Sequence, residues 1–168
     1  ELPALNKLDC STDGFEWNNC IDHNDGTLSF LRKSGNLEEN LLVVANFSKN
    51  TYENYKLSVA EDGKYTQIFS SNLVSCGGNA KLDSSEITTK EEYYDGRNNT
   101  LEITLDAMSV AIYAYRPFTK EELLAIAEKK VEMIRKQLEK EALEKAEALK
   151  KATLKENLEA KVNEAQEK

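Results

Sequence analysis

The fold of this chain is indicated most directly by Asp13-Gly14-Phe15-Glu16-Trp17-Asn18-Asn19-Cys20, which contains its only tryptophan. Leu5, Leu8 and Asp9 precede this stretch, and Thr27-Leu28-Ser29-Phe30-Leu31-Arg32 follows it. Aromatic and β-branched residues favour strands, and Gly, Asn and Asp favour the turns between them. The stretch and the segment after it therefore predict two successive β-strands.

Residues 1–118 as a whole predict an antiparallel Greek-key β-sandwich. Turn signals such as Glu61-Asp62-Gly63 and Asp95-Gly96-Arg97 separate short apolar segments. Apolar residues take every second place in Leu101-Glu102-Ile103-Thr104-Leu105, which predicts a strand with one face in water. Leu41-Leu42-Val43-Val44-Ala45 is apolar throughout and predicts a central strand covered on both faces. The expected strands are 15–21, 27–32, 41–47, 55–59, 65–70, 85–89, 101–105 and 109–115.

Residues 119–168 predict a charged amphipathic helical extension. All seven glycines and both prolines lie before Phe118, and Ala, Leu, Glu and Lys dominate after it. Thr119 and Glu122 form the pattern of a capping box, and Phe118 and Leu123 are placed to form a hydrophobic staple. A straight helix of this length extends about 75 Å, whereas a 118-residue domain has a radius of gyration of about 13 Å. The helix must therefore project, fold back or pack on something else.

The helix has a narrow apolar stripe formed by Leu124, Ala127, Val131, Ile134, Leu138, Ala142 and Leu149. Ala127, Leu138, Leu149 and Ala160 are eleven residues apart, which keeps the stripe in line on a nearly straight helix. A strict heptad repeat is not maintained, because Glu141 and Lys145 occupy positions that it would fill with apolar residues. Two interpretations follow: the first turns dock on the sandwich, or the helix pairs with another copy.

Charge and composition exclude several classes of function. The net charge of −8 lies entirely in residues 1–118, because residues 119–168 carry 12 acidic and 12 basic side chains. This balance disfavours nucleic acid and anionic membranes, and no apolar run approaches the roughly 20 residues of a membrane span. The long spacings between the three cysteines predict free thiols in a reducing cytosol, with a Cys10–Cys20 disulfide as the alternative. We therefore expect a cytoplasmic protein.

The sequence contains no phosphate-binding loop, no nucleophile motif and no common zinc spacing, so we expect no catalytic residues, no metal and no cofactor. His23 is the only histidine, and a lone histidine in a turn is expected to be structural. Because the chain begins at Glu1 rather than at methionine, we expect a fragment of a longer protein.

Aromatic side chains beside planar polar groups are the features that could bind a sugar, which has an apolar ring face and a rim of hydroxyls. Trp17 with Glu16, and with Asn18 and Asn19 next to it, is the strongest candidate. The tyrosine pairs Tyr52/Tyr55 and Tyr93/Tyr94 are two others. The alternative for each is packing in the core or between the sheets.

Five ordered segments give the first half of the chain a recognisable pattern. They are Leu8-Asp9 with Gly14-Phe15-Glu16-Trp17, then Leu28-Ser29-Phe30-Leu31-Arg32, Leu42-Val43-Val44-Ala45-Asn46-Phe47-Ser48, Cys76-Gly77-Gly78-Asn79, and Gly96-Arg97 with Leu101-Glu102-Ile103-Thr104-Leu105. With these segments, about residues 2–116 resemble the C-terminal β-domain of bacterial 1,4-α-glucan (glycogen) branching enzymes, members of the α-amylase superfamily. The helix after Phe118 has no counterpart in that pattern.

The resemblance implies a parent enzyme that cuts an α-1,4-glucan and rejoins the piece through an α-1,6 bond. Its carboxylate nucleophile and acid/base would belong to an upstream (β/α)₈ barrel of roughly 250 residues. Residues 1–118 would then be a non-catalytic domain that supports this barrel, with the Trp17 segment facing it and contacting α-glucan. The alternatives are a free-standing glucan-binding module and an oligomerisation module built on the helix, which would give self-association through residues 119–168.

Overall fold

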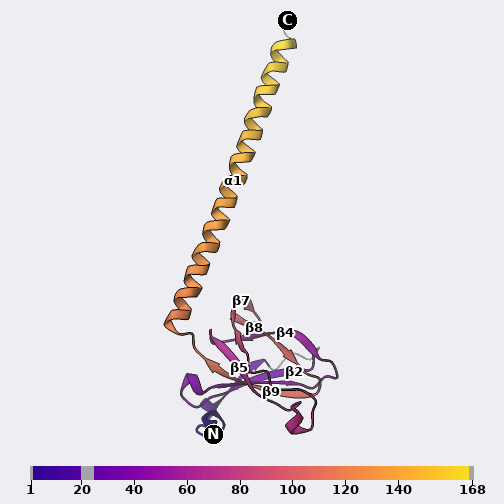
Figure 1. Cartoon of the computed structure of the whole chain (residues 1–168), viewed down its shortest axis with the longest axis vertical. Coiled ribbons are helices and arrows are strands. Elements are labelled where there is room, and N and C mark those ends of the chain that lie inside the picture. The colour runs from indigo at the N-terminus through magenta and orange to yellow at the C-terminus, as the bar shows by residue number, and fades with distance from the viewer. Residues whose placement is uncertain (1, 20–24, 167–168) are drawn as a thin grey trace. The chain divides into compact units, whose positions relative to one another are not determined.

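The computed structural model describes residues 2–19 and 25–166. The chain divides into two compact units, Glu1–Phe118 and Thr119–Lys168. The first unit is a β-sandwich and the second is one long helix (Figure 1).

The larger sheet of the sandwich has six antiparallel strands within the described residues. The expected hairpin at the start of the chain is present, because Trp17 pairs across the strands with Phe30. Non-consecutive neighbours in this sheet mean that the chain leaves it and returns several times. In spatial order the strands are β1 (Phe15–Asn19), β2 (Thr27–Arg32), β3 (Leu41–Asn46), β9 (Ser109–Arg116), β5 (Lys64–Ser70) and β6 (Glu86–Thr88).

The smaller sheet consists, in spatial order, of β4 (Tyr52–Val59), β8 (Arg97–Leu105) and β7 (Lys90–Tyr94). In β8 the residues Leu101, Ile103 and Leu105 are buried, whereas Glu102 and Thr104 are exposed. This alternation confirms the prediction of a strand with one face in water. The apolar face of β8 points at the six-stranded sheet, because its three leucine and isoleucine side chains belong to the common core.

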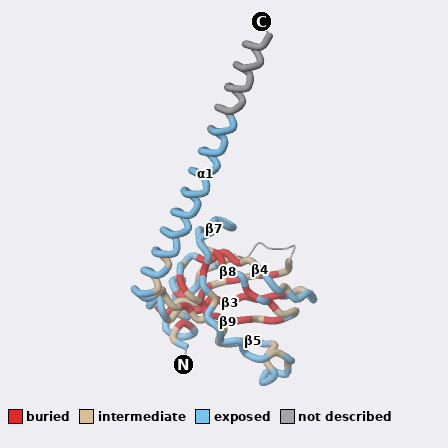
Figure 2. The backbone as a smooth tube through the Cα atoms, turned by 45° about the horizontal axis from the view of Figure 1, so that its top comes forward, coloured by how far each residue is buried: buried red, intermediate tan, exposed pale blue. Residues whose placement is uncertain are grey.

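The core lies between the two sheets, as the buried segments of Figure 2 show. Leu42 and Val44 of β3 pack in it with Leu57 and Val59 of β4. Tyr65 and Tyr115 add two rings whose centroids are 5.3 Å apart. The expected sandwich is therefore confirmed as a mainly antiparallel β fold.

Every residue of β3 is buried, as its uninterrupted apolar sequence predicts. The strand lies inside the six-stranded sheet between β2 and β9, and alternate residues point to opposite faces. Leu42 and Val44 enter the core, so Leu41, Val43 and Ala45 lie on the outer face of the same sheet. That outer face is consequently apolar at its centre as well.

Helix α1 runs from Lys120 to Gln166. Thr119 caps it: the Glu122 amide donates to the Thr119 hydroxyl (3.3 Å), and the Thr119 amide donates to the Glu122 carboxylate (2.9 Å). The predicted capping box is therefore confirmed. No helix in the described part of the chain is long and apolar enough to cross a membrane.

Three strand expectations need correction. The sequence does not predict strand β7, because Lys90-Glu91-Glu92 gives it no apolar pattern and all five of its residues are exposed. Strand β4 begins at Tyr52, three residues earlier than expected. Strand β8 begins at Arg97, four residues earlier than expected. Strands β7 and β8 form a hairpin in which Tyr94 pairs with Arg97 around Asp95-Gly96, both with positive φ, which is the geometry of a two-residue hairpin turn.

Candidate functional site

Trp17 lies in an aromatic cluster on the outer face of the six-stranded sheet. Its ring centroid is 5.0 Å from that of Phe15 and 6.0 Å from that of Phe30, with edge-to-face orientations. Half of the Trp17 surface is exposed. The cluster thus packs on itself and still presents an indole face to solvent.

The cluster is one end of a row that crosses the sheet. Strand pairing places Trp17 beside Phe30, Phe30 beside Val43, Val43 beside Ile112, and Ile112 beside Phe69. Phe69, at the other end, is 36% exposed. We call these five residues with their outward-facing neighbours the outer apolar face; the neighbours are Phe15, Leu28, Leu41, Ala45, Val110 and Ala114.

Ion pairs border the outer apolar face near two of its corners. Arg32, on the same side of β2 as Phe30, contacts Asp9 at 2.6 Å. Near β6, the Glu86 carboxylate accepts from Lys64 and Arg116, each at 2.9 Å. A continuous apolar surface edged by charged side chains is typical of an interaction site rather than of free solvent-facing sheet.

Glu16 lies on the opposite side of β1 from Trp17. Its carboxylate accepts from Lys33 and, at 3.4 Å, from Arg97. The hydrogen bond from Lys33 is the main reason that the pKa of Glu16 lies below its usual range, and the Arg97 guanidinium acts in the same direction. The two residues expected to share a glucan site therefore point away from each other.

The amides next to Trp17 are also occupied by protein contacts. Asn18 donates from Nδ2 to the Ser29 hydroxyl (3.0 Å) and to the Ser58 carbonyl (2.8 Å), and Asn19 donates to Asp95 (3.0 Å). These bonds tie β1 to β2 and to the other sheet. Trp17 is thus left with aromatic rather than polar neighbours on its exposed side.

The tyrosine pairs, separate in sequence, contribute to one open groove along β4. Tyr52, Tyr55 and Tyr94 line it, and the Tyr52 and Tyr55 centroids are 5.8 Å apart. The Lys56 ammonium lies 5.6 Å from the Tyr94 ring centroid. The groove has a volume of about 420 Å³. The sequence alone does not bring these tyrosines together, because it does not predict strand β7. The Asp95-Gly96 hairpin turn is the feature of the sequence from which this strand could have been predicted.

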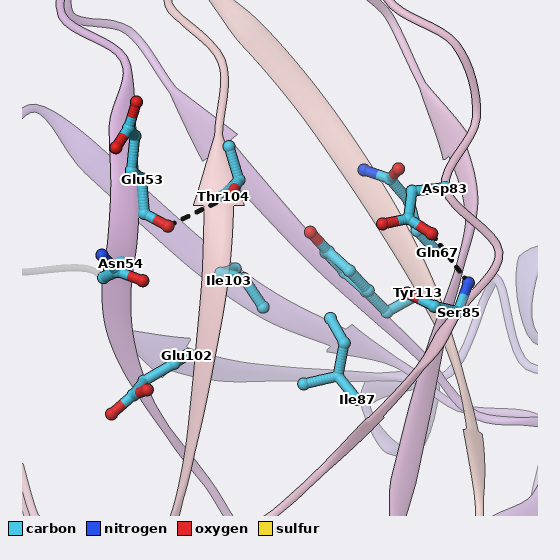
Figure 3. Close-up of a pocket in the computed structure, with 10 residues that line it drawn as sticks. All are labelled: Glu53, Asn54, Gln67, Asp83, Ser85, Ile87, Glu102, Ile103, Thr104 and Tyr113. Atoms are coloured by element: carbon cyan, nitrogen blue, oxygen red, sulfur yellow. Dashed lines mark hydrogen bonds between the residues drawn. The ribbon is translucent and has the colours of Figure 1, made fainter.

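A second cavity, of about 230 Å³, opens between the two sheets (Figure 3). Tyr113, Ile87 and Ile103 form its apolar wall, and Glu53, Glu102 and Asp83 line it with carboxylates. The Ser85 amide donates to Asp83 at 2.9 Å and holds the pKa of that carboxyl below its usual range. Asp83 is consequently an acceptor rather than a proton donor near neutral pH. Burial raises the pKa of the Tyr113 phenol to about 12, so that it stays protonated.

Within residues 2–19 and 25–166, no group of three or more His, Cys, Asp or Glu side chains could hold a metal ion. Cys10 and Cys76 are free and exposed. His23 and Cys20, and with them the alternative Cys10–Cys20 disulfide, lie outside the described residues.

The family model of the α-amylase C-terminal all-β domain matches residues 17–116. The chain is also similar to proteins named 1,4-alpha-glucan branching enzyme GlgB. It is 37% identical over 114 residues to that of Prochlorococcus marinus strain AS9601, covering 68% of this chain and 15% of the relative. It is 34% identical over 119 residues to that of Bacillus cereus strain AH820, covering 67% and 18%. The chain thus spans less than a fifth of the length of these relatives.

The match covers β2 to β9 completely and begins within β1 at Trp17. It confirms the resemblance that the ordered segments indicated. The chain belongs to the family of α-amylase C-terminal all-β domains.

Proposed function

We propose that residues 1–118 are the non-catalytic C-terminal domain of a cytosolic 1,4-α-glucan branching enzyme, and that their outer apolar face packs on the upstream catalytic barrel. The observation that carries the proposal is the row from Trp17 to Phe69. It crosses five strands on the side of the sheet that does not face the core, and both of its ends are exposed. A sheet that is apolar on both faces needs cover on both.

The chemistry of branching is assigned to the barrel. A retaining glycoside-cleaving centre needs a carboxylate nucleophile and a second carboxyl that gives up a proton, which requires a raised pKa. Asp83, one of the three carboxylates that line the inter-sheet cavity, has a lowered pKa instead. This favours a supporting role for the domain.

The first test is activity. The 168-residue chain alone is incubated with amylose, and branching is followed by the change in iodine absorbance, with a complete branching enzyme as positive control. We expect no change; branching by the chain alone would overturn the assignment.

The second test is docking, measured in the full-length parent enzyme. Trp17→Asp and Phe69→Asp place a charge at either end of the outer apolar face, and both should lower the melting temperature and the branching rate of the parent. Tyr93→Asp is the matched control, because Tyr93 is an aromatic residue that is 74% exposed on β7. The same substitutions remove packing within the sheet as well, so they should lower the melting temperature of the isolated chain, but less than that of the parent. A parent that tolerates both Trp17→Asp and Phe69→Asp would exclude this face as the contact.

A second candidate function is glucan binding by the domain itself. The exposed Trp17 ring and the groove with three tyrosines favour it, because sugars stack on aromatic faces. Affinity electrophoresis in glycogen gels distinguishes the two candidate binding sites. Trp17→Ala abolishes retardation if the indole binds glucan, and Tyr94→Ala abolishes it if the groove binds glucan. Tyr93→Ala is the control, since Tyr93 does not line the groove. A chain that migrates identically with and without glycogen would exclude this function.

A further inference from the structure

Four of the seven glycines directly follow an aspartate, at Asp13-Gly14, Asp25-Gly26, Asp62-Gly63 and Asp95-Gly96. In such a step the amide nitrogen of the glycine can attack the side-chain carboxyl group of the aspartate, because glycine has no side chain to obstruct the approach. The reaction needs a main chain that can rotate and an amide that no other group holds. The steps differ in how far the fold meets these two requirements.

The Asp62-Gly63 step is held by several contacts. The buried Gly63 amide donates to the Thr89 hydroxyl at 3.0 Å, and the Gly63 carbonyl accepts from the Thr89 amide at 3.0 Å. The Thr89 hydroxyl also donates to the Asp62 carboxylate, and the Tyr115 hydroxyl donates to the Asp62 carbonyl at 3.0 Å. A Cβ atom at Gly63 would stand 2.6 Å from the Arg116 carbonyl oxygen, so this step has no room to rotate.

The Asp13-Gly14 step is held in a similar way. Gly14 is buried, and its amide donates to the Ser11 carbonyl at 3.1 Å. A Cβ atom there would collide with the Leu8 carbonyl oxygen. The Asp25-Gly26 step adjoins residues 20–24, which lie outside the described residues, and it is not compared.

The Asp95-Gly96 step is open. Both residues are exposed in the turn between β7 and β8, and a Cβ atom at Gly96 would meet no heavy atom within 4 Å. No hydrogen bond from the Gly96 amide is found among the described residues. The Asp95 carboxylate accepts from the Asn19 side chain at 3.0 Å, in a position exposed to solvent. The attacking amide is therefore free, and a single exposed hydrogen bond restrains the carboxylate.

We propose that Asp95 is a site of spontaneous isomerisation in the folded protein, whereas Asp62 and Asp13 are protected by the fold. The Gly96 nitrogen forms a bond to Cγ of Asp95, and its proton leaves as water with the hydroxyl group of the neutral carboxyl. Water then opens the resulting succinimide ring. Opening at the side-chain carbonyl restores aspartate, and opening at the main-chain carbonyl leaves Gly96 attached through Cγ as isoaspartate. This proposal is independent of the proposed enzyme function.

Isomerisation at Asp95 should release the end of β7 that adjoins the turn. Isoaspartate adds one carbon to the main chain of a two-residue turn, whose geometry leaves no place for it. This turn sets Tyr94 opposite Arg97, and Tyr94 lines the groove along β4. The far end of β7 keeps its ion pair between Lys90 and Glu102 at 2.6 Å. The expected product is therefore a chain that has lost one wall of the tyrosine groove.

The test is ageing of the full 168-residue chain for several weeks at physiological temperature and pH, folded and in concentrated urea. Trypsin then releases Glu91–Arg97 and Leu57–Lys64, each of which contains one Asp-Gly step followed by a basic residue. An isoaspartyl peptide has an unchanged mass, elutes separately in reversed-phase chromatography and resists the endoproteinase that cuts before aspartate. The two peptides thus measure an open and a held step in the same molecule.

In the folded chain isoaspartate should accumulate at Asp95 at least about ten-fold faster than at Asp62, which reacts only when its segment opens. In urea the two rates should converge, because the fold no longer distinguishes the steps. A folded chain in which both steps react equally, or in which Asp95 is slowed as much as Asp62, would overturn the proposal.

Two variants test the two halves of the explanation. Gly96→Asn keeps a residue that tolerates positive φ but places a side chain beside the attacking nitrogen, so isoaspartate should no longer accumulate at Asp95. Thr89→Val removes the hydroxyl that holds the other step, so it should speed the reaction at Asp62 and leave the rate at Asp95 unchanged. An unaltered rate at Asp95 in the first variant, or at Asp62 in the second, would contradict the proposal.

Hydrogen exchange followed by mass spectrometry measures the consequence for the groove. Residues 93–97 of the aged wild-type chain should exchange faster than those of a fresh sample, and Gly96→Asn aged for the same time should show no such change. Equal exchange in the aged and fresh wild-type chains would refute the release of β7.

Discussion

Gly14 lies where the turns at the start of the chain come closest to the beginning of β1. A Cβ atom at this residue would stand 2.2 Å from the Leu8 carbonyl oxygen and 2.9 Å from the Leu8 Cβ. The Gly14 carbonyl also accepts from the Lys33 amide at 3.0 Å, which fixes the approach from the other side. The glycine of the Gly14-Phe15-Glu16-Trp17 motif is therefore required by space rather than by a special φ angle.

We expect Gly14→Ala to destabilise the β-domain by about 1–3 kcal/mol, the usual cost of forcing an extra carbon into a packed site. Chemical denaturation followed by Trp17 fluorescence measures this. Thr12→Ala, an exposed change on the same turn, should leave the midpoint unchanged. Equal stability of Gly14→Ala would mean that the turn shifts freely.

The Glu16–Lys33–Arg97 contacts make part of the stability depend on pH. Because the pKa of Glu16 is lowered in the folded protein, the carboxylate stabilises the fold above its ordinary value near 4.5, and this contribution disappears as the pH falls through the lowered value. The Glu16 side chain is 39% exposed, so solvent screening limits the effect to less than about 1 kcal/mol.

Glu16→Gln should therefore lower the unfolding free energy slightly at pH 7, and this difference should shrink as the pH falls through the lowered pKa of Glu16. Urea denaturation at pH 7 and at a series of acidic pH values checks this. Lys33→Gln, which removes the first partner of the carboxylate, should move the pKa of Glu16 back toward its ordinary value in an NMR titration. A titration that does not move would refute the assignment of Lys33 as the main cause.

At the scale of elements, the sequence predicts the strands and the helix whose pattern of apolar and polar residues matches their burial in the fold. Strand β3 is recognisable because five successive apolar residues between two asparagines are typical of a strand covered on both faces, and α1 because no glycine or proline interrupts it. Strand β7 is missed because a solvent-facing strand needs no apolar residues. The pairing of Glu16 with Lys33 and Arg97 is also missed, since it depends on which face of β1 turns inward. The tyrosine groove requires a contact between segments about 40 residues apart.

The first turn of α1 gives a prediction at this scale. Thr119→Ala removes the hydroxyl that accepts from the Glu122 amide and should cost roughly 1 kcal/mol of helix stability. Circular dichroism at 222 nm as a function of temperature measures it. Lys120→Ala, one residue on, keeps the cap and should have little effect. Unchanged helicity in Thr119→Ala would show that the box is not needed to begin the helix.

At the scale of the whole molecule, the division at Phe118 separates two kinds of stability. The sandwich has a common core of residues distant in sequence, whereas ion pairs within α1, such as Arg135–Glu139, join residues four apart along the chain. The family resemblance can be recognised from the sequence because it depends on ordered local motifs. The outer apolar face cannot be recognised in this way, because strand alternation alone does not say that its centre is buried while Trp17 and Phe69 at its ends stay exposed.

The two units should therefore unfold in separate transitions. Trp17 fluorescence reports the sandwich and far-ultraviolet circular dichroism reports mainly the helix, so the two urea curves should not coincide. Leu57→Ala, at a core position that is 2% exposed, should cost about 2–5 kcal/mol and move only the fluorescence curve. A single transition shared by both probes would show that the units are coupled.

Strand β7 is rich in charged residues and therefore shows no hydrophobic pattern. The same charges affect how the protein behaves in concentrated solution. This strand forms one edge of the three-stranded sheet, where unpaired backbone groups could recruit a strand from another molecule and begin a fibril. Lys90-Glu91-Glu92 covers part of that edge with charge of both signs, and Lys90 and Glu92 are tied to Glu102 and Lys56 at 2.6 and 2.7 Å. The three charged residues that make β7 hard to predict from the sequence thus also protect this edge against amyloid-like growth.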